Sequence, residues 1–284
     1  MKIHAKYIAL VACFLAPVAN AQEGSETAEM SEAERVYSSL EFSQGPGTYD
    51  VTSRAEIALP EGYDRLDADD TAKLMALYQN PTSVDEYYVA PIDERWFSVF
   101  SYEDTGHIKD DEEIDSGALL ESIRAGTDVG NRERRERGWP EMTIVGWQAE
   151  PRYDEKSNRL SWAVLAESEG QQIVNYNTRL LGRTGVMSAT LVADPATLDQ
   201  SIAEFETMLL GFDYKPGNLY AEYRDGDKLA AYGLAALVTG GAAAAVAKGA
   251  GKGFFKMIGL GVLALFAFFG NAIKRVFSRN KAVD

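Results

Sequence analysis

The stretch QIVNYNTRLLGRTGVMSATLVA, residues Gln172–Ala193, decides the fold that we predict for this chain. Two runs of alternating apolar and polar residues flank the turn Gly182–Gly185, and this pattern is typical of a β-hairpin. On the first strand, one face carries Val174, Tyr176, Thr178 and Leu180, and the other carries Asn175, Asn177 and Arg179. The polar row is a candidate binding face, although a sheet face in contact with water would show the same alternation.

A second hairpin is predicted immediately before the first. Met142–Trp147 and Asn158–Ser168 are strand-like runs, and Pro151–Ser157 between them has the composition of a turn. Farther upstream, Arg54–Pro60 and Tyr87–Tyr102 are rich in branched and aromatic residues. We expect a short strand in the first of these and two strands, or one broken strand, in the second. Together these runs predict an antiparallel sheet.

Three helices are predicted around this sheet. The first is capped by Asp70 or Thr71 and runs to Tyr78. The second begins at Gly117 after a cap at Asp115 or Ser116, and the third begins at Asp194-Pro195. The order is strands, helix, a run of antiparallel strands and then a helix. This order predicts an α+β fold, an antiparallel sheet with packed helices, followed by a C-terminal transmembrane helix or helical hairpin.

The amino end, residues 1–21, resembles a secretory signal peptide. Basic residues precede an apolar core, and Ala19-Asn20-Ala21 fits a cleavage site. A lipoprotein signal in which Cys13 would carry the lipid is the open alternative. Residues 22–34 are acidic and nearly free of large apolar side chains, so we expect them to be disordered or to form the frayed start of a helix.

The composition limits the classes of partner and site. The chain of 284 residues has a formal charge of −15 at pH 7 and no evident basic face, so no nucleic acid is expected to bind. The single cysteine lies in the predicted signal peptide, which excludes disulfides and thiolate metal sites from the exported part. Residues 35–222 are long enough for one α+β domain with a sizeable core, and we expect this domain to face the periplasm.

The C-terminal part, residues 223–284, is predicted to anchor the protein in a membrane. The stretch 254–273 is the stronger span, because a bilayer core needs about 20 mostly apolar residues and a basic tail follows it. The stretch 229–247 is uncharged but rich in Ala and Gly. It is a weaker span, a helix packed on the first, or a flexible linker. Whether the chain crosses the membrane once or twice stays open, and so does the side of the membrane on which the C-terminus lies.

Small residues in this part recur at the spacing that lets membrane helices approach closely, namely Gly240, Ala244, Gly249 and Gly253. The expected partners are therefore the membrane and, through this Gly/Ala-rich tail, another membrane protein or a second copy of the chain. The expected location is a bacterial inner membrane.

The segment Tyr102–Asp115, YEDTGHIKDDEEID, is a second candidate binding site. Its candidate residues are Lys109, Asp110 and Asp111. Its acids lack the spacing of an EF-hand loop, so no metal site is predicted, and nothing in the chain predicts a cofactor. His107 is the only histidine outside the signal peptide and is expected in a surface turn.

Several short motifs occur together along the chain. They are YExTGxIKDDE at 102–112, RxxxGW at 134–139, GW at 146–147, PRY at 151–153, NYNTRLLGR at 175–183 and GDKxAxYGLAALV at 226–238. As a set they resemble the bacterial membrane-anchored proteins of unknown function called DUF2167. The resemblance spans nearly all of the exported chain and implies an exported domain with a C-terminal anchor. It implies no activity and therefore no catalytic residues. The order of elements is also similar to PsbP-like proteins, as an analogy only.

Three functions are compatible with these features. The first is a non-enzymatic envelope protein that acts in interaction or assembly, and the missing catalytic set favours it. The second is a carboxylate-based hydrolase, with acids drawn from Asp104, Asp110, Asp111 and Glu112. The third is a small-ligand or metal-binding domain that uses the polar row at Asn175, Asn177 and Arg179 or the acidic segment.

Overall fold

The computed structural model describes residues 32–78, 80 and 85–239 of the 284-residue chain. The chain divides into two compact units, residues 1–40 and residues 41–284. In the first unit the structure describes helix α1 (Glu32–Ser38), which has no buried residue. The second unit contains the sheets and the other helices.

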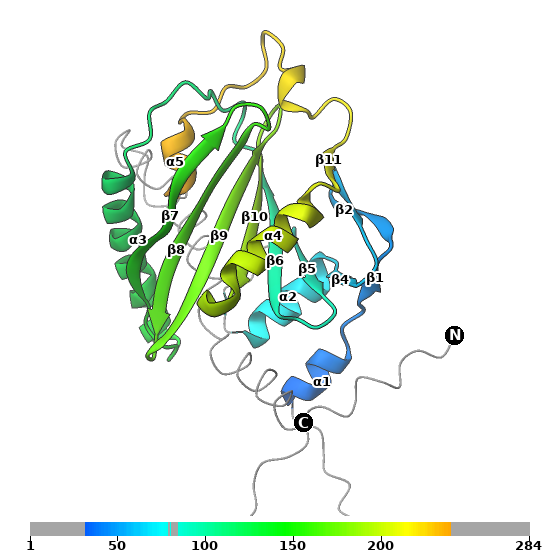
Figure 1. The fold of residues 1–284 in the computed structure, drawn as a ribbon, viewed down its shortest axis with the longest axis vertical. Helices are drawn as coiled ribbons and strands as arrows, with labels where there is room; N and C mark the ends of the chain where they lie inside the picture. Colours follow the sequence, from blue (N-terminus) through cyan, green and yellow to red (C-terminus); the bar gives the residue numbers. More distant parts are fainter. Residues whose placement is uncertain (1–31, 79, 81–84, 240–284) are drawn as a thin grey trace, which may run out of the picture. The chain divides into compact units, whose positions relative to one another are not determined.

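An eight-stranded sheet is the largest element of the second unit (Figure 1). Its spatial order is β1-β4-β5-β6-β10-β9-β8-β7, and all neighbouring pairs are antiparallel. Its strands are β1 (Ser43–Gln44), β4 (Tyr63–Leu66), β5 (Glu86–Pro91), β6 (Trp96–Glu103), β7 (Thr143–Asp154), β8 (Arg159–Ser168), β9 (Gln171–Leu181) and β10 (Val186–Ala193). A second sheet, in the order β11-β3-β2, consists of β2 (Gly47–Thr52), β3 (Ala55–Leu59) and β11 (Phe212–Tyr214).

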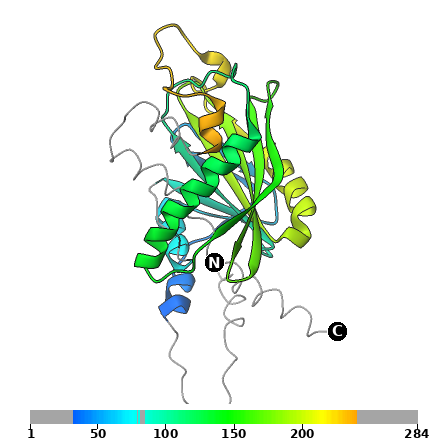
Figure 2. The ribbon, with the colours of Figure 1, turned by 90° about the vertical axis from the view of Figure 1, so that its left-hand side faces the viewer.

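Helices cover both faces of the large sheet. They are α2 (Ala68–Leu77), α3 (Ser116–Glu136), α4 (Leu198–Leu209) and α5 (Leu234–Val238), with short 3-10 turns η2 (Pro195–Thr197) and η3 (Tyr220–Glu222). Figure 2 shows α3 and α4 on opposite sides of the sheet, with α5 on the side of α3. The sheet therefore has an α4 face and an α3 face.

The main core lies on the α4 face. Because strand residues alternate between faces, Val174 and Leu180 of β9 point into this core together with alternate residues of β10. Phe205 of α4 is fully buried there, with its ring 5.9 Å from Trp96 in an edge-to-face arrangement. Side chains of α4 also reach strand residues, since Glu204 accepts from the indole N–H of Trp96 at 3.0 Å. Helix α4 is thus fixed by packing and by polar contacts.

The predicted α+β class and the antiparallel sheet with packed helices are confirmed. Both predicted hairpins form, and the one over Gln172–Ala193 has the register expected for a turn at Gly182–Gly185, with Leu181 opposite Val186. Helix α3 begins after Asp115, whose carboxylate accepts from the backbone N–H of Ala118 at 3.0 Å. The side-chain cap explains why this helix start could be recognised.

Two predicted boundaries are wrong. Helix α2 begins earlier than expected, because Asp67 caps it by accepting from the backbone N–H of Asp70. The predicted turn Pro151–Ser157 belongs largely to β7, which continues to Asp154. Strand β7 is an edge strand, so the missing N–H of a proline leaves no neighbouring strand without a hydrogen bond.

The predicted membrane spans fall mostly outside the described residues. Within residues 32–78, 80 and 85–239, no helix is both long and apolar enough to cross a bilayer. The stretch 254–273 lies outside this part of the chain, as does the predicted signal peptide. Of the weaker stretch, residues 229–239 are described, and four residues of α5 within them are buried: Leu234, Ala236, Leu237 and Val238. The folded unit therefore continues beyond residue 222, where we expected the domain to end.

Candidate functional site

Three of the sequence motifs meet at one end of the large sheet. The chain leaves β6 at Glu103 and turns at Gly106, which has a φ of +95°. The next residue, His107, forms an isolated parallel bridge with Leu229, and Gly182 forms an isolated antiparallel bridge with Leu219. We call residues 219–238 the docked segment, since these contacts hold it against the end of the sheet.

His107 lies at the centre of this contact. Its ring stacks between Tyr220, at 4.4 Å between centroids, and Tyr223, at 4.2 Å. Its Nδ1 lies 3.1 Å from the carbonyl oxygen of Arg183. The side chain is buried, so the expected surface-turn position is wrong. The two tyrosines account for the burial, and they could not be paired with His107 from the sequence because more than a hundred residues separate them.

Arg183 and Asp227 form a second contact between the sheet and the docked segment. The guanidinium donates from Nε and from its second terminal nitrogen to the two carboxylate oxygens, at 2.7 and 2.8 Å. Such two-point pairs are the strongest of the charge-assisted hydrogen bonds. The hydrogen bonds from Arg183 lower the pKa of Asp227 to about 2.

This pair predicts an acid-sensitive docked segment. Because the pKa of Asp227 is lower in the folded chain than its ordinary value of 3.8, the pair stabilises above about pH 4. That stabilisation is lost as the pH falls from about 4 to about 2.

Hydrogen exchange of residues 219–238, corrected for intrinsic rates, should show protection falling across this window. Asp227→Asn should show reduced protection at neutral pH and little further change, whereas exposed Asp225→Asn should behave like the wild type. An unchanged profile in Asp227→Asn would contradict the assignment.

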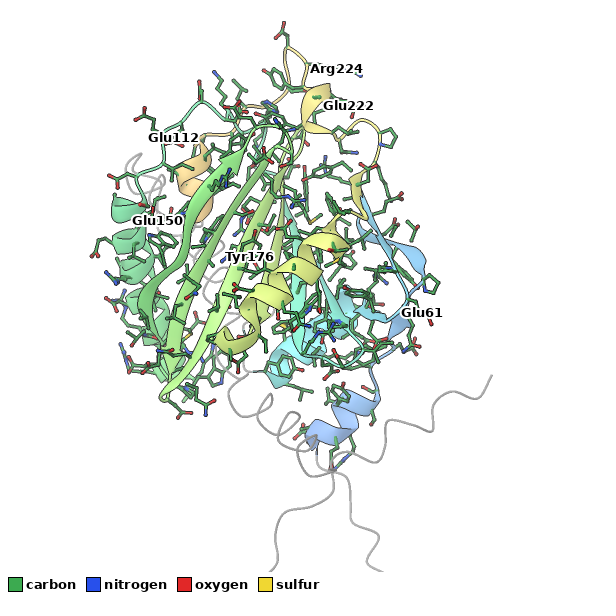
Figure 3. All side chains as sticks on the ribbon, in the orientation of Figure 1. Glu61, Glu112, Glu150, Tyr176, Glu222 and Arg224 are labelled. Atoms are coloured by element: carbon green, nitrogen blue, oxygen red, sulfur yellow. The ribbon has the colours of Figure 1, made fainter. Side chains whose placement is uncertain are left out.

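Glu112 fixes the end of the docked segment. Its carboxylate accepts from the backbone N–H of Ala235 at 3.0 Å, in the first turn of α5. A Cβ at Gly233 would come within 2.3 Å of the same carboxylate, so any other residue there would make the Glu112 side chain shift. Figure 3 shows Glu112 close to α5. Glu112 therefore acts as a helix cap that connects the acidic segment to α5.

Two other acids of the predicted hydrolase pool, Asp104 and Asp110, also make contacts within the fold. Asp104 forms an ion pair with Arg54 at 3.2 Å, and Asp110 accepts from the hydroxyl of Tyr153 at 3.0 Å. Lys109 and Asp111, the other two candidates of the acidic segment, are exposed. In the described part of the chain, no group of three or more His, Cys, Asp or Glu side chains could hold a metal ion.

The polar row of β9 is buried, not solvated. Asn175 is 1% exposed, Asn177 4% and Arg179 3%, and all three lie on the α3 face. The alternative in which this row faces water is therefore wrong. Alternation along the strand identified the row, but it could not show that the α3 face is covered, because coverage depends on distant elements.

Residues of neighbouring strands extend this row. Ser188 and Thr190 of β10 lie directly opposite Arg179 and Asn177, and both are buried. On the other side, the guanidinium of Arg179 lies over the ring of Trp162, 4.9 Å from its centroid. The polar residues of β9 and β10, together with Trp162 of β8, form a group that we call the Arg179 cluster. Its members are Trp162, Asn175, Asn177, Arg179, Ser188 and Thr190.

The sequence did not predict that this site includes Trp162, Ser188 and Thr190. The hairpin register would have indicated the two β10 residues, because a turn at Gly182–Gly185 places Ser188 opposite Arg179. Farther along the same row, Ser188 is opposite Ser101 and Ser101 is opposite Glu86. Burial raises the pKa of Glu86 to about 7, so this carboxyl is partly protonated at neutral pH.

Comparisons with known proteins agree with the motif resemblance. The sequence profile of DUF2167, described as a protein of unknown function, matches residues 43–272. No curated protein matches the chain.

Solved structures show weak likenesses. Cyanobacterial PsbP from Synechocystis sp. PCC 6803 is 11% identical, with a TM-score of 0.33 over 62% of this chain and 92% of that chain. PA94 from Pseudomonas aeruginosa, a putative regulator of unknown function, is 12% identical, with a TM-score of 0.26 over 60% and 97%. The immunity protein TplEi from the same organism is 8% identical, with a TM-score of 0.26 over 60% and 76%. Likenesses at this level carry no functional argument.

Proposed function

The chain belongs to DUF2167, a family of proteins of unknown function, and from this premise we propose that it is a non-enzymatic interaction component of the cell envelope. In this proposal the protein is exported, the folded unit faces the periplasm, and the C-terminal stretch 254–273 holds it in the inner membrane. The Gly/Ala-rich residues before that stretch form the contact with a membrane partner or with a second copy.

One observation carries this proposal: the chain that leads toward the apolar stretch is not a loose linker. Residues 219–238 are held by the stacked His107, by the pair Arg183–Asp227 and by the cap from Glu112. These contacts involve residues of three sequence motifs, since His107 and Glu112 lie in 102–112, Arg183 in 175–183 and Asp227 in 226–238. A fixed junction of this kind supports a role in which the orientation of the domain relative to its anchor matters.

The hydrolase alternative receives less support from the geometry. A glycosidase of the common type needs two carboxyl groups about 5–10 Å apart that are free to act on the substrate. Asp104, Asp110 and Glu112 instead contact Arg54, Tyr153 and the N-terminus of α5, respectively. Their arrangement is explained by the fold, so no catalytic role is required to account for it.

The location is tested first. In cells that make the full chain, the protein should remain in the inner-membrane fraction after an alkaline carbonate wash, because an apolar span resists this extraction. A protease added from outside should cleave the domain only after the outer membrane is made permeable. Release of the protein by carbonate, or cleavage only after cell lysis, would contradict the proposed anchor or the proposed orientation.

The interaction is tested by cross-linking in intact cells. The full-length chain should recover a specific envelope protein, or a second copy of itself. A variant in which residues 240–273 are replaced by an unrelated apolar span should recover at least tenfold less, since membrane contacts of this type depend on small residues. Equal recovery by both chains would refute contact through the tail, and no cross-linked protein with either would refute the interaction role.

A further inference from the structure

Arg179 is a buried cation with few contacts of its own. Its side chain is almost fully buried, and its guanidinium donates to the carbonyl oxygen of Thr178 at 3.4 Å, a long hydrogen bond. Among the described residues, no carboxylate oxygen lies within 4.0 Å of it. Glu103 and Tyr232 are near enough for their charges to act on it, but neither shifts its pKa through a hydrogen bond. The charge of Arg179 therefore lacks a close partner in the part of the chain that the structure describes.

A buried guanidinium normally has a carboxylate or phosphate beside it. Removing the cation from water is costly, and it is offset when an anion and several hydrogen bonds replace the lost hydration. The ring of Trp162 offsets part of that cost through a cation–π contact, but it accepts no hydrogen bond in the plane of the guanidinium. Burial without an anion lowers the pKa of Arg179 from its ordinary value.

The residues around Arg179 provide further donors. Ser188 lies directly opposite and is buried, and its hydroxyl can donate a hydrogen bond. The side-chain N–H₂ of Asn177 donates to the carbonyl oxygen of Asn175 at 3.2 Å. Its side-chain oxygen accepts from the hydroxyl of Thr190, also at 3.2 Å. That pairing fixes the orientation of Asn177 beside the guanidinium. The side-chain oxygen of Asn175 is buried and has no partner among the described residues.

From this arrangement we propose that the Arg179 cluster binds a small oxyanion, a carboxylate or a phosphate group, through the guanidinium of Arg179 and the hydroxyl of Ser188. A planar guanidinium can donate two parallel hydrogen bonds to either kind of group. The unpaired oxygen of Asn175 suits an N–H or O–H donor elsewhere on the ligand. The ligand class is therefore a small organic acid or phosphate ester that also carries a hydrogen-bond donor.

The experiment measures the melting temperature of the full-length protein in detergent with phosphate, acetate or succinate added. Chloride keeps the ionic strength constant, and the anions are kept in the millimolar range so that general salt effects stay small. We expect a saturable rise that reaches about 5–10 °C at roughly one hundred times the dissociation constant. A response to acetate or succinate alone indicates a carboxylate ligand, and a response to phosphate alone indicates a phosphate.

Two arginine variants separate binding from a structural role. Arg179→Met keeps the length of the side chain and removes the buried charge, so it should melt no lower than the wild type without anion and should lose the anion response. Arg132→Met, at an exposed position on α3, should keep that response. Ser188→Ala is the milder variant and should weaken the anion response several-fold while leaving the fold intact.

Either of two results would overturn the proposal. The first is a wild-type protein whose melting temperature does not respond to any of the three anions. The second is an equal response in Arg179→Met, which would place the anion elsewhere. Neither result bears on contact through residues 240–273, so this inference and the proposed interaction role can fail separately.

Discussion

Replacing Phe205 with alanine is expected to lower the free energy of unfolding by about 3–5 kcal/mol. The Phe205 ring is fully buried on the α4 face, where it contacts the rings of Trp96 and Tyr176 edge-on, at 5.9 and 6.1 Å between centroids. Its removal leaves a cavity between a helix and a sheet that are also joined by hydrogen bonds, so the helix cannot move in to fill the space.

Leu210, directly after α4, provides the matched control. Its side chain is 82% exposed, so Leu210→Ala removes an apolar group that contacts mostly water. Its effect on the free energy of unfolding should stay within about 0.5 kcal/mol. Both variants are measured by urea denaturation of the purified protein. Equal destabilisation by the two would show that α4 does not pack on the sheet through Phe205.

The second large effect is expected for Gly106→Ala. Gly106 has a φ of +95°, and a Cβ there would lie 2.8 Å from the backbone of Lys228 and Leu229. Strain at the positive φ and the overlap with backbone together should cost about 2–6 kcal/mol. Because the overlap falls on the docked segment, the substitution should expose residues 219–238 before the sheet unfolds. Limited proteolysis should then cut this segment at least tenfold faster.

Gly62 provides the control that separates strain at a positive φ from overlap with neighbouring backbone. It also has a positive φ, +90°, but a Cβ there would meet no atom within 4 Å. Gly62→Ala should therefore show the conformational strain alone, about 1–3 kcal/mol, and leave the proteolysis of residues 219–238 unchanged. If both glycine variants release the docked segment equally, its contact with Gly106 contributes nothing to its position.

The larger elements of the fold could be predicted because their signals are local. Strands β9 and β10 alternate regularly about a glycine turn, and α3 begins with a capping aspartate and ends at Gly138, which has a φ of +68°. Several of the shortest strands were not predicted. For example, β4 has four residues and β11 three, which is too few for a periodic pattern to stand out. Such strands form because longer neighbours offer them hydrogen bonds, which is tertiary information.

The candidate site was predicted in part for the same reason. The row of Asn175, Asn177 and Arg179 follows directly from alternation along one strand. Its burial depends on elements far away in the sequence, and the unpaired state of Arg179 depends on where every carboxylate of the folded unit lies. The acidic segment gave the opposite result: its acids were noticeable as a group, but Asp110 and Glu112 have separate structural contacts.

The docked segment also determines how the folded unit would respond to mechanical force on its C-terminal side. A pull transmitted from residue 239 reaches the Glu112 cap first, then the backbone hydrogen bonds of His107 with Ala230 and Lys228, and then the pair Arg183–Asp227. These contacts lie in series along the chain, so they would break one after another at modest load. The eight-stranded sheet would stay intact until this segment had been pulled away, so the docked segment would yield first and protect the sheet from the load.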